Sequence, residues 1–197
     1  MLHPHTELKF VSKEIGYGVF ATQRIPKGTI VWTLDQLDRI ITREEASRIT
    51  GANWVNLDKY TFNNRNGDYV FCWDLTRYVN HSFEPNSMLT SMDFEVAIKD
   101  IEIGDEITND YGTLNCPEVF ECSKGPHKDR KSVKPDDLVT YHTEWDKLVA
   151  SAMKHFHQVK QPLMEFLSSD TKQMVDDIHA GKIALPSVLL NHYQPKK

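Results

Sequence analysis

The sequence predicts a mainly β domain followed by a C-terminal helical extension. Residues 1 to about 115 contain short apolar stretches separated by turn signals every ten or so residues, which is typical of short strands. Beyond Pro135 the apolar residues instead recur with the helical period of about 3.6 residues. With 197 residues, of which 40% are hydrophobic, the chain is long enough to bury a sizeable core.

Short strands are expected throughout the first part, with one short helix among them. A capping box at Thr42–Glu45 predicts that this helix extends to about Ile49 and ends near Gly51. Asn66-Gly67 is a two-residue turn signal, so the strands on either side of it are expected to pair as a hairpin. The candidate strands are Leu8–Val11, Gly18–Thr22, Gly28–Trp32, Tyr60–Phe62, Tyr69–Phe71, Glu95–Ile98 and Glu106–Thr108.

Helices are expected in the last part of the chain. Asp136 or Asp137 can cap the first of them, and a second is expected from about Asp170 to Ala180, where Gly181 ends it. The apolar positions of the first helix are Leu138, Tyr141, Trp145, Leu148, Val149, Ala152, Met153 and Phe156. We therefore divide the chain into residues 1–116, a linker of 117–135 and a helical extension of 136–197.

Charge and composition exclude several classes of protein. Lys and Arg number 23 against 28 Asp and Glu, a net charge of -5, so a general nucleic-acid binder is not expected. A mildly acidic protein suits a basic partner instead. No apolar run approaches the ~20 residues that span a bilayer, so no membrane partner is expected. No signal peptide is evident, and the compartment expected by default is intracellular and cytoplasmic, with a nuclear location or export as an effector left open.

Three short segments contain residues suited to binding or chemistry. The first is Gly16-Tyr17-Gly18, in which paired glycines let the backbone approach a ligand closely and Tyr17 offers a flat face. A plain hairpin turn is the alternative explanation. The third glycine and the helix of a dinucleotide-binding fingerprint are missing, which excludes that class.

The other two segments follow further along the chain. Asn80-His81-Ser82 with Pro85-Asn86 offers amide and imidazole groups to a polar ligand, although Asn80 could instead satisfy local backbone groups. In the third segment, a turn at Gly104 leads into a strand that ends on Tyr111-Gly112, where Tyr111 is either functional or an ordinary core aromatic.

Together and in this order, the three segments resemble the SET domain, the β-rich fold of most protein-lysine methyltransferases. The resemblance covers roughly residues 6 to 115, so residues 1–116 are interpreted as the SET domain. It implies a fold of small curved β-sheets. It also implies that the Asn80-His81 segment and the closing segment thread through each other in a pseudoknot, an exception to the usual rule for chain connections.

The resemblance also implies a set of site residues. S-adenosylmethionine is expected to bind against Gly16, Tyr17 and Gly18, with Asn80 and His81 holding its adenine and amino-acid ends. Catalysis is expected at Tyr111, where the methyl group leaves the sulfur. The lysine channel is expected to include Tyr60 and Asn109. Asn109 stands where family members usually have Phe or Tyr, and this leaves the number of methyl groups transferred open.

The chemistry sets demands that these residues can meet. Methyl transfer to lysine is an in-line displacement, so most of the catalysis is positioning. The amine must be neutral, which costs about 4 kcal/mol at neutral pH for a group with a pKa of ~10.4, and a desolvated channel beside a positive sulfonium lowers that cost. Tyr111 is a poor base because its own pKa lies near ~10, so a fixed hydroxyl dipole is its expected role.

The sequence departs from many family members in its cysteines. Phe83 stands where they have a zinc-binding cysteine after Asn-His-Ser, and Lys124 follows Cys122 where a second tail cysteine would fall. One thiolate cannot hold a structural zinc, so no zinc or other metal is expected. The linker is therefore interpreted as a degenerate tail of a compact member resembling bacterial or viral ones. The C-terminal helices, with Trp145 and Tyr141, are then expected to complete the pocket, although both residues also suit a helix core.

The expected function is S-adenosylmethionine-dependent methyl transfer to the ε-amine of a lysine in a basic, histone-like protein. An alternative is a non-catalytic SET-fold module that binds a lysine-bearing partner without turnover. Keeping the whole cofactor set argues against this alternative, because a binding module has no use for it. A third alternative is a methyltransferase for a small molecule or free amino acid, which needs a closed pocket.

Overall fold

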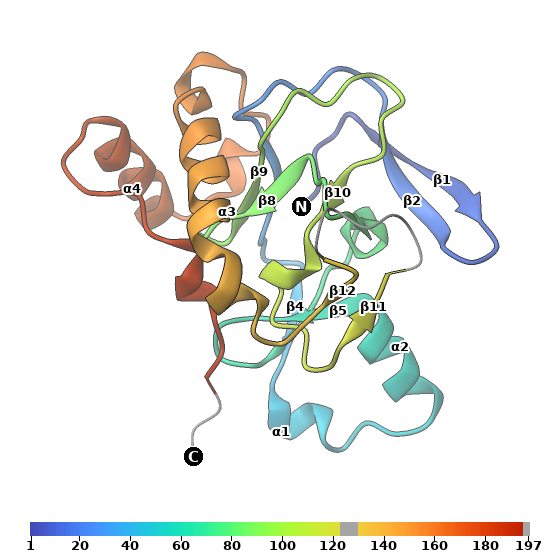
Figure 1. Cartoon of the computed structure of the whole chain (residues 1–197). Coiled ribbons are helices and arrows are strands. Elements are labelled where there is room, and N and C mark those ends of the chain that lie inside the picture. The colour runs from blue at the N-terminus through green and yellow to red at the C-terminus, as the bar shows by residue number, and fades with distance from the viewer. Residues whose placement is uncertain (123–129, 195–197) are drawn as a thin grey trace.

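The computed structural model describes residues 1–122 and 130–194, and in these the predicted mainly β part and C-terminal helices are both present (Figure 1). The helices are α1 (Arg43–Ala46), α2 (Ala52–Tyr60), α3 (Asp137–Met153) and α4 (Ser169–His179). The strands are β1 (Thr6–Ser12), β2 (Gly16–Ala21), β3 (Ile30–Thr33), β4 (Arg39–Ile41), β5 (Thr61–Asn63), β6 (Tyr69–Phe71), β7 (Asn80–His81), β8 (Ser87–Leu89), β9 (Phe94–Ala97), β10 (Thr108–Asn109), β11 (Phe120–Glu121) and β12 (Ser132–Val133).

These strands pair into small separate sheets. Antiparallel pairs join β1 to β2 and β11 to β12, and three-stranded sheets have the orders β3-β9-β8 and β4-β6-β5. The two-residue strands β7 and β10 pair in parallel, which brings the second and third motif segments side by side. The arrangement of small strand-rich sheets with C-terminal helices is consistent with a SET-domain fold.

The main core lies between the sheet β3-β9-β8 and the C-terminal helices. Phe94 on β9 is fully buried, and its ring lies 6.0 Å from that of Phe156, which follows α3. Trp145 and Val149 on α3 are buried in the same cluster. Figure 1 shows α3 running alongside β8 and β9. Because the helices supply one side of this core, they are part of the same folded unit as the sheet.

The capping box is confirmed, but the helix after it is shorter than expected. Thr42 Oγ1 accepts a hydrogen bond from the Glu45 backbone N–H, and the Glu45 carboxylate accepts one from the Thr42 N–H. α1 ends at Ala46, and Gly51, expected to follow the end of this helix, instead stands at the start of α2. Tyr60, expected in a strand, is the last residue of α2.

The hairpin at Asn66-Gly67 is present with a longer loop than the two-residue turn predicted. Asn64 O accepts from the Gly67 N–H at 2.9 Å, and the Asn64 N–H donates to Asp68 O at 3.0 Å. Gly67 has a φ of 78°, a conformation that favours glycine. The connection between β5 and β6 therefore consists of Asn64–Asp68, five residues that contain a turn with a left-handed glycine.

The segment predicted as a linker contributes regular structure near the site. Its described residues include β11 and β12, which pair antiparallel, with Phe120 opposite Val133. Residue 124, used in the sequence argument about cysteines, lies outside the described residues. No helix in the described part of the chain is long and apolar enough to cross a lipid bilayer.

Candidate functional site

The three motif segments meet around a hollow of about 810 Å³. This volume lies within the range of pockets that hold small ligands and cofactors. Its walls come from the β1–β2 turn, the end of α2, the turn Leu75–Tyr78, β7 and β11. Of the predicted site residues, Gly16, Tyr17, Tyr60, Asn80, His81 and Tyr111 line it.

Backbone and amide hydrogen bonds hold the second motif against the third. The Ser82 N–H donates to Asn109 O at 2.9 Å, next to the parallel pairing of β7 and β10. The Asn86 side chain donates to Glu106 O at 2.8 Å and accepts from the Thr108 N–H at 2.9 Å. The Asn86 side chain thus pairs with the backbone of the third segment as a strand residue would, because an amide can both donate and accept a hydrogen bond.

The Asn80 amide is oriented by the first and third motifs. Its Nδ2 donates to Tyr17 O at 3.1 Å and to Glu106 Oε1 at 2.7 Å. A Cβ on Gly18 would lie 2.3 Å from Glu106 Oε1, so the absence of a side chain there makes this contact possible. With both donor hydrogens used, Asn80 offers its Oδ1 to a ligand in the hollow as an acceptor.

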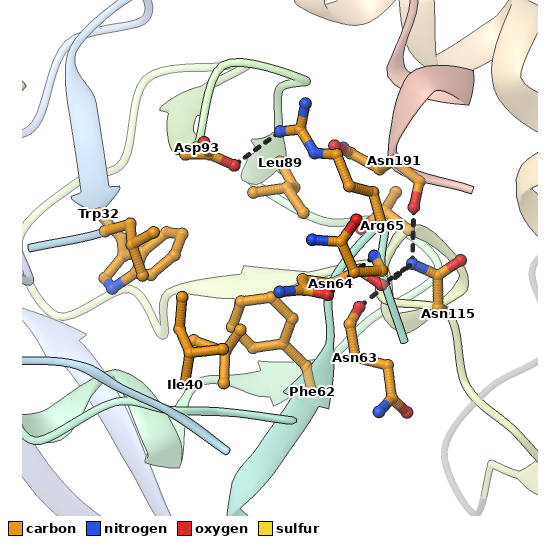
Figure 2. A pocket seen from close by; sticks show the side chains of 14 residues that line it. Trp32, Ile40, Phe62, Asn63, Asn64, Arg65, Leu89, Asp93, Asn115 and Asn191 are labelled. Carbon is orange, nitrogen blue, oxygen red and sulfur yellow. Dashed lines mark hydrogen bonds and ion pairs between the residues drawn. The ribbon is translucent and has the colours of Figure 1, made fainter. Parts of the chain in front are cut away.

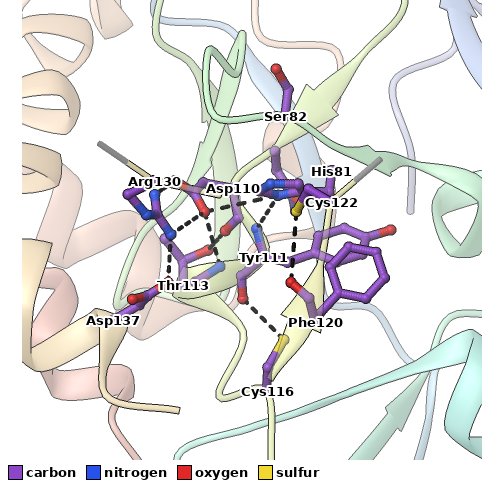
Figure 3. Close-up of polar contacts among 12 residues, drawn as sticks. His81, Ser82, Asp110, Tyr111, Thr113, Cys116, Phe120, Cys122, Arg130 and Asp137 are labelled. Atoms are coloured by element: carbon purple, nitrogen blue, oxygen red, sulfur yellow. Dashed lines mark hydrogen bonds and ion pairs between the residues drawn. The ribbon is translucent and has the colours of Figure 1, made fainter. Parts of the chain in front are cut away.

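A hydrogen bond joins the Tyr111 backbone to the His81 ring, as Figure 3 shows. The Tyr111 N–H donates to His81 Nδ1 at 3.1 Å, so the imidazole proton resides on Nε2. In the described part of the chain Nε2 is buried and has no hydrogen-bond partner. Burial lowers the pKa of His81, while nearby Asp110 opposes this shift. His81 is therefore a neutral imidazole with an unused donor.

Tyr111 presents a fixed, neutral hydroxyl. Its O–H donates to Val79 O at 2.8 Å, which leaves the oxygen lone pairs free. Burial raises the pKa of the Tyr111 phenol well above its ordinary value. A phenol that holds its proton so firmly is a poor general base, in line with the dipole role expected from the sequence.

Aromatic rings form the wall of the hollow around these groups. Tyr78 lies between Tyr17 and Tyr60, with ring centroids 6.3 and 5.7 Å away. On another side, Phe120 of β11 packs 5.9 Å from Tyr111 and 6.1 Å from His81. The sequence analysis did not predict that Tyr78 and Phe120 line the hollow. Tyr78 could have been predicted, because it lies only two residues before Asn80.

Three predictions about the lining do not agree with the structure. Gly18, expected to contact the cofactor, is buried and does not line the hollow. Asn109 is buried away from the hollow, and its Nδ2 donates to Glu95 Oε1 at 2.6 Å. Its side chain therefore partners a buried carboxylate, whose pKa burial raises, and does not line a channel. The C-terminal helices do not line the hollow either, because Trp145 is a core residue. The residues nearest to them in sequence that do line it are Phe120, Glu121 and Cys122.

The cysteines and histidines of the described residues form no metal centre. Across residues 1–122 and 130–194, no group of three or more His, Cys, Asp or Glu side chains is arranged to hold a metal ion. Cys116 donates through Sγ to Tyr111 O at 3.4 Å, and Cys122 lines the hollow. The absence of zinc stays a prediction from the sequence.

A second, smaller cavity of about 180 Å³ lies against Trp32 and Phe62 (Figure 2). Its rim is rich in asparagine, but the central amide is used internally: Asn115 Nδ2 donates to Asn63 O at 3.1 Å and to Asn191 O at 2.7 Å. None of the predicted site residues lines it. We therefore place the chemistry in the larger hollow.

Comparison with known families agrees with the geometry. The family model of the SET domain matches residues 16–112, which include all three motif segments, and the chain belongs to the SET-domain family. SET domains are generally protein-lysine methyltransferases, and the methyltransferases of the family generally use S-adenosylmethionine. No curated protein matches the sequence.

Proposed function

We propose that this protein transfers a methyl group from S-adenosylmethionine to the ε-amine of a lysine in a protein substrate. The observation that supports this most is the convergence of three groups on one hollow. Asn80 offers an acceptor, His81 an unused N–H donor and Tyr111 a fixed hydroxyl oxygen.

The residues present fit the proposed cofactor. An amide oxygen at Asn80 suits an ammonium group, and the orphaned Nε2–H of His81 suits an acceptor such as a carboxylate or a ring nitrogen. Gly16 would lie against the cofactor beside exposed Tyr17, whereas Gly18 leaves the room that Glu106 and Asn80 occupy. When bound, S-adenosylmethionine supplies a methyl group on a positively charged sulfur, which a neutral amine displaces in line.

The chain's own groups then supply positioning and desolvation. The Tyr111 oxygen keeps its lone pairs because its proton is donated to Val79, so it can orient a methyl group of partial positive charge. Tyr60 and Tyr78 would surround the lysine with apolar ring surface, which favours the neutral amine. We also propose that the segments around β7 and β10 thread as a pseudoknot, an arrangement that their parallel pairing supports.

The substrate we propose is a basic protein with an exposed lysine, because the chain has a net charge of -5. We propose an intracellular, reducing location, since Cys72, Cys116 and Cys122 are all free thiols. The number of methyl groups transferred is not assigned, because Asn109 does not line the hollow.

Tyr111→Phe provides the test of this function. With radiolabelled S-adenosylmethionine and a mixture of basic proteins such as histones, we expect the wild type to label lysine. The variant should lose roughly a hundredfold in turnover, as expected when one fixed dipole at the reacting group is removed. Its cofactor affinity should stay the same.

Tyr69→Phe is the matched control, because Tyr69 packs against Trp54, away from the hollow. It should label substrate at the wild-type rate. Unchanged turnover in Tyr111→Phe would remove Tyr111 from the mechanism. Cofactor binding by the wild type without labelling of any lysine protein would favour the non-catalytic binding module.

A further inference from the structure

A buried ion cluster lies beside His81, and none of its residues lines the hollow. Arg130, just before β12, is 12% exposed in its side chain and bonds two carboxylates. Its Nη1 and Nη2 donate to Asp110, the Nη2 bond being 3.2 Å long, and Nη2 also donates to Asp137 Oδ2 at 2.5 Å. We call these three residues the Arg130 cluster; Figure 3 shows them beside His81.

The surroundings of Arg130 are built to hold a guanidinium. Its central carbon lies 4.6 Å from the ring centroids of both Phe83 and Tyr141. A Cβ on Gly112 would lie 2.9 Å from Nη2, so the glycine after Tyr111 leaves the space that the guanidinium fills. The planar guanidinium meets two carboxylates and two rings; a lysine here would keep the positive charge but not this bidentate, stacked geometry.

Besides the packing of Arg130 on Phe83, the Arg130 cluster contacts the candidate site through the carboxylate of Asp110. Asp110 Oδ1 accepts from the Gly112 N–H at 3.0 Å and lies 3.9 Å from His81 Nδ1. That same Nδ1 accepts the Tyr111 N–H. If His81 were protonated, Nδ1 would become a donor, and the hydrogen bond that joins His81 to Tyr111 would be lost.

Opposing charges act on His81 from the surrounding elements. In the described residues, Asp110 before Tyr111 and Asp137 of α3 favour the protonated ring, whereas Arg130 and burial disfavour it. Without Arg130, His81 would face two buried carboxylates that no cation offsets. A positive charge on Arg130 therefore has a direct consequence for the protonation state of a site residue.

We propose that Arg130 is a positioning residue that keeps His81 neutral and so preserves the Nδ1 acceptor for the Tyr111 N–H, the hydrogen bond that fixes the orientation of the ring and of its Nε2–H donor. The role of that donor rests on the proposed function. The effect of Arg130 on His81 does not, because it concerns the free protein.

The test is an NMR titration of the His81 ring in the cofactor-free protein, with Arg130→Met, Arg130→Lys and the control Arg24→Met. Arg24 also pairs with two carboxylates, Asp100 and Glu102, but at an exposed site far along the chain from His81. We expect Arg130→Met to shift the midpoint of the His81 titration to higher pH. Arg130→Lys keeps the positive charge, so its midpoint should lie close to that of the wild type. Arg24→Met should leave it unchanged. An unshifted midpoint in folded Arg130→Met overturns the proposal.

Binding of S-adenosylmethionine supplies the second readout. At mildly acidic pH the protonated His81 ring of Arg130→Met loses its hydrogen bond from the Tyr111 N–H and is free to turn, so this variant should lose about tenfold in affinity. The loss should be much smaller at mildly alkaline pH. Equal losses at both pH values, or in Arg130→Lys as much as in Arg130→Met, indicate a merely structural role and overturn the proposal. A wild type that does not bind the cofactor contradicts the proposed function and leaves the NMR result intact.

If Arg130→Met does not fold, Asp110→Asn takes its place. This variant keeps an acceptor for the Gly112 N–H and removes the charge that Arg130 offsets. The His81 midpoint should then move to lower pH, the opposite direction, and Arg130→Lys should still titrate close to the wild type. A midpoint that Asp110→Asn leaves unchanged overturns the electrostatic link.

Discussion

Gly18 shows how a single missing side chain orients a ligand-binding group. Any Cβ there would lie 2.3 Å from Glu106 Oε1 and 3.0 Å from Asn80 Nδ2, so the Asn80–Glu106 hydrogen bond depends on the glycine. The backbone of Gly18 is not left-handed, in contrast to that of Gly16, whose φ is 86°. Space, rather than conformational freedom, therefore explains the glycine at position 18.

We predict that Gly18→Ala weakens S-adenosylmethionine binding by about tenfold, because Glu106 must move and the Asn80 amide is then free to rotate. Isothermal titration measures this directly. Gly104→Ala is the control: its φ of 87° makes alanine strained, but no atom lies within 4 Å of the added Cβ. It should lower stability without changing affinity, and wild-type affinity in Gly18→Ala would contradict the account of Asn80.

The segment between α3 and α4 connects the helical extension to the β3 sheet. Gln161, between α3 and α4, accepts from the Ile30 N–H at 2.9 Å through Oε1, and its Nε2 donates to Gly28 O and Phe156 O, both at 2.8 Å. This one side chain joins the start of β3 to the end of the helical layer. It does so through backbone groups that the core otherwise leaves without partners.

We predict that Gln161→Ala lowers the free energy of unfolding by about 2 kcal/mol, since it leaves the Ile30 N–H unsatisfied beside the core. Urea denaturation followed by tryptophan fluorescence gives the value. Gln173→Ala is the matched control, because Gln173 lies on the exposed face of α4 and bonds only Asp177 there. If Gln161→Ala has the same free energy of unfolding as Gln173→Ala, the hydrogen bonds of Gln161 do not stabilise the fold.

Elements with a strong local signal were predictable from the sequence. The 3.6-residue period of α3, the capping box at Thr42 and the turn at Gly67 all have local physical causes. α2 was missed because it starts at Gly51 without a side-chain cap and buries only Leu57, so it has neither a start signal nor an apolar stripe. β11 and β12 are two residues each, too short to show a period.

The same distinction explains the candidate site. Asn80, His81 and Tyr111 were identified because their motifs are contiguous in sequence, and the structure brings them to one hollow. Asn109 follows Thr108 on the same strand, but its side chain donates to Glu95. The two residues are distant in sequence, so no local pattern predicts this contact. Arg130 was missed for the same reason, since its carboxylate partners come from two other segments.

Considered as a whole, the molecule is one folded unit that extends beyond the region matched by the family. The match covers residues 16–112, yet the core beside β9 is closed by Trp145, Val149 and Phe156. The Arg130 cluster connects the same helical layer to the motif that contains Tyr111. Experiments on function therefore require the full chain.

The most direct test of the account is isothermal titration of the 197-residue chain with S-adenosylmethionine, for wild type and Asn80→Ala, with Asn115→Ala as control. Asn115 is another amide with several backbone partners, but it lies at the smaller cavity. We predict one-to-one micromolar binding by the wild type and the control, and a loss of at least about tenfold in Asn80→Ala. Absence of binding by the folded wild type, or equal affinity in Asn80→Ala, would contradict the assignment of the hollow as the cofactor site.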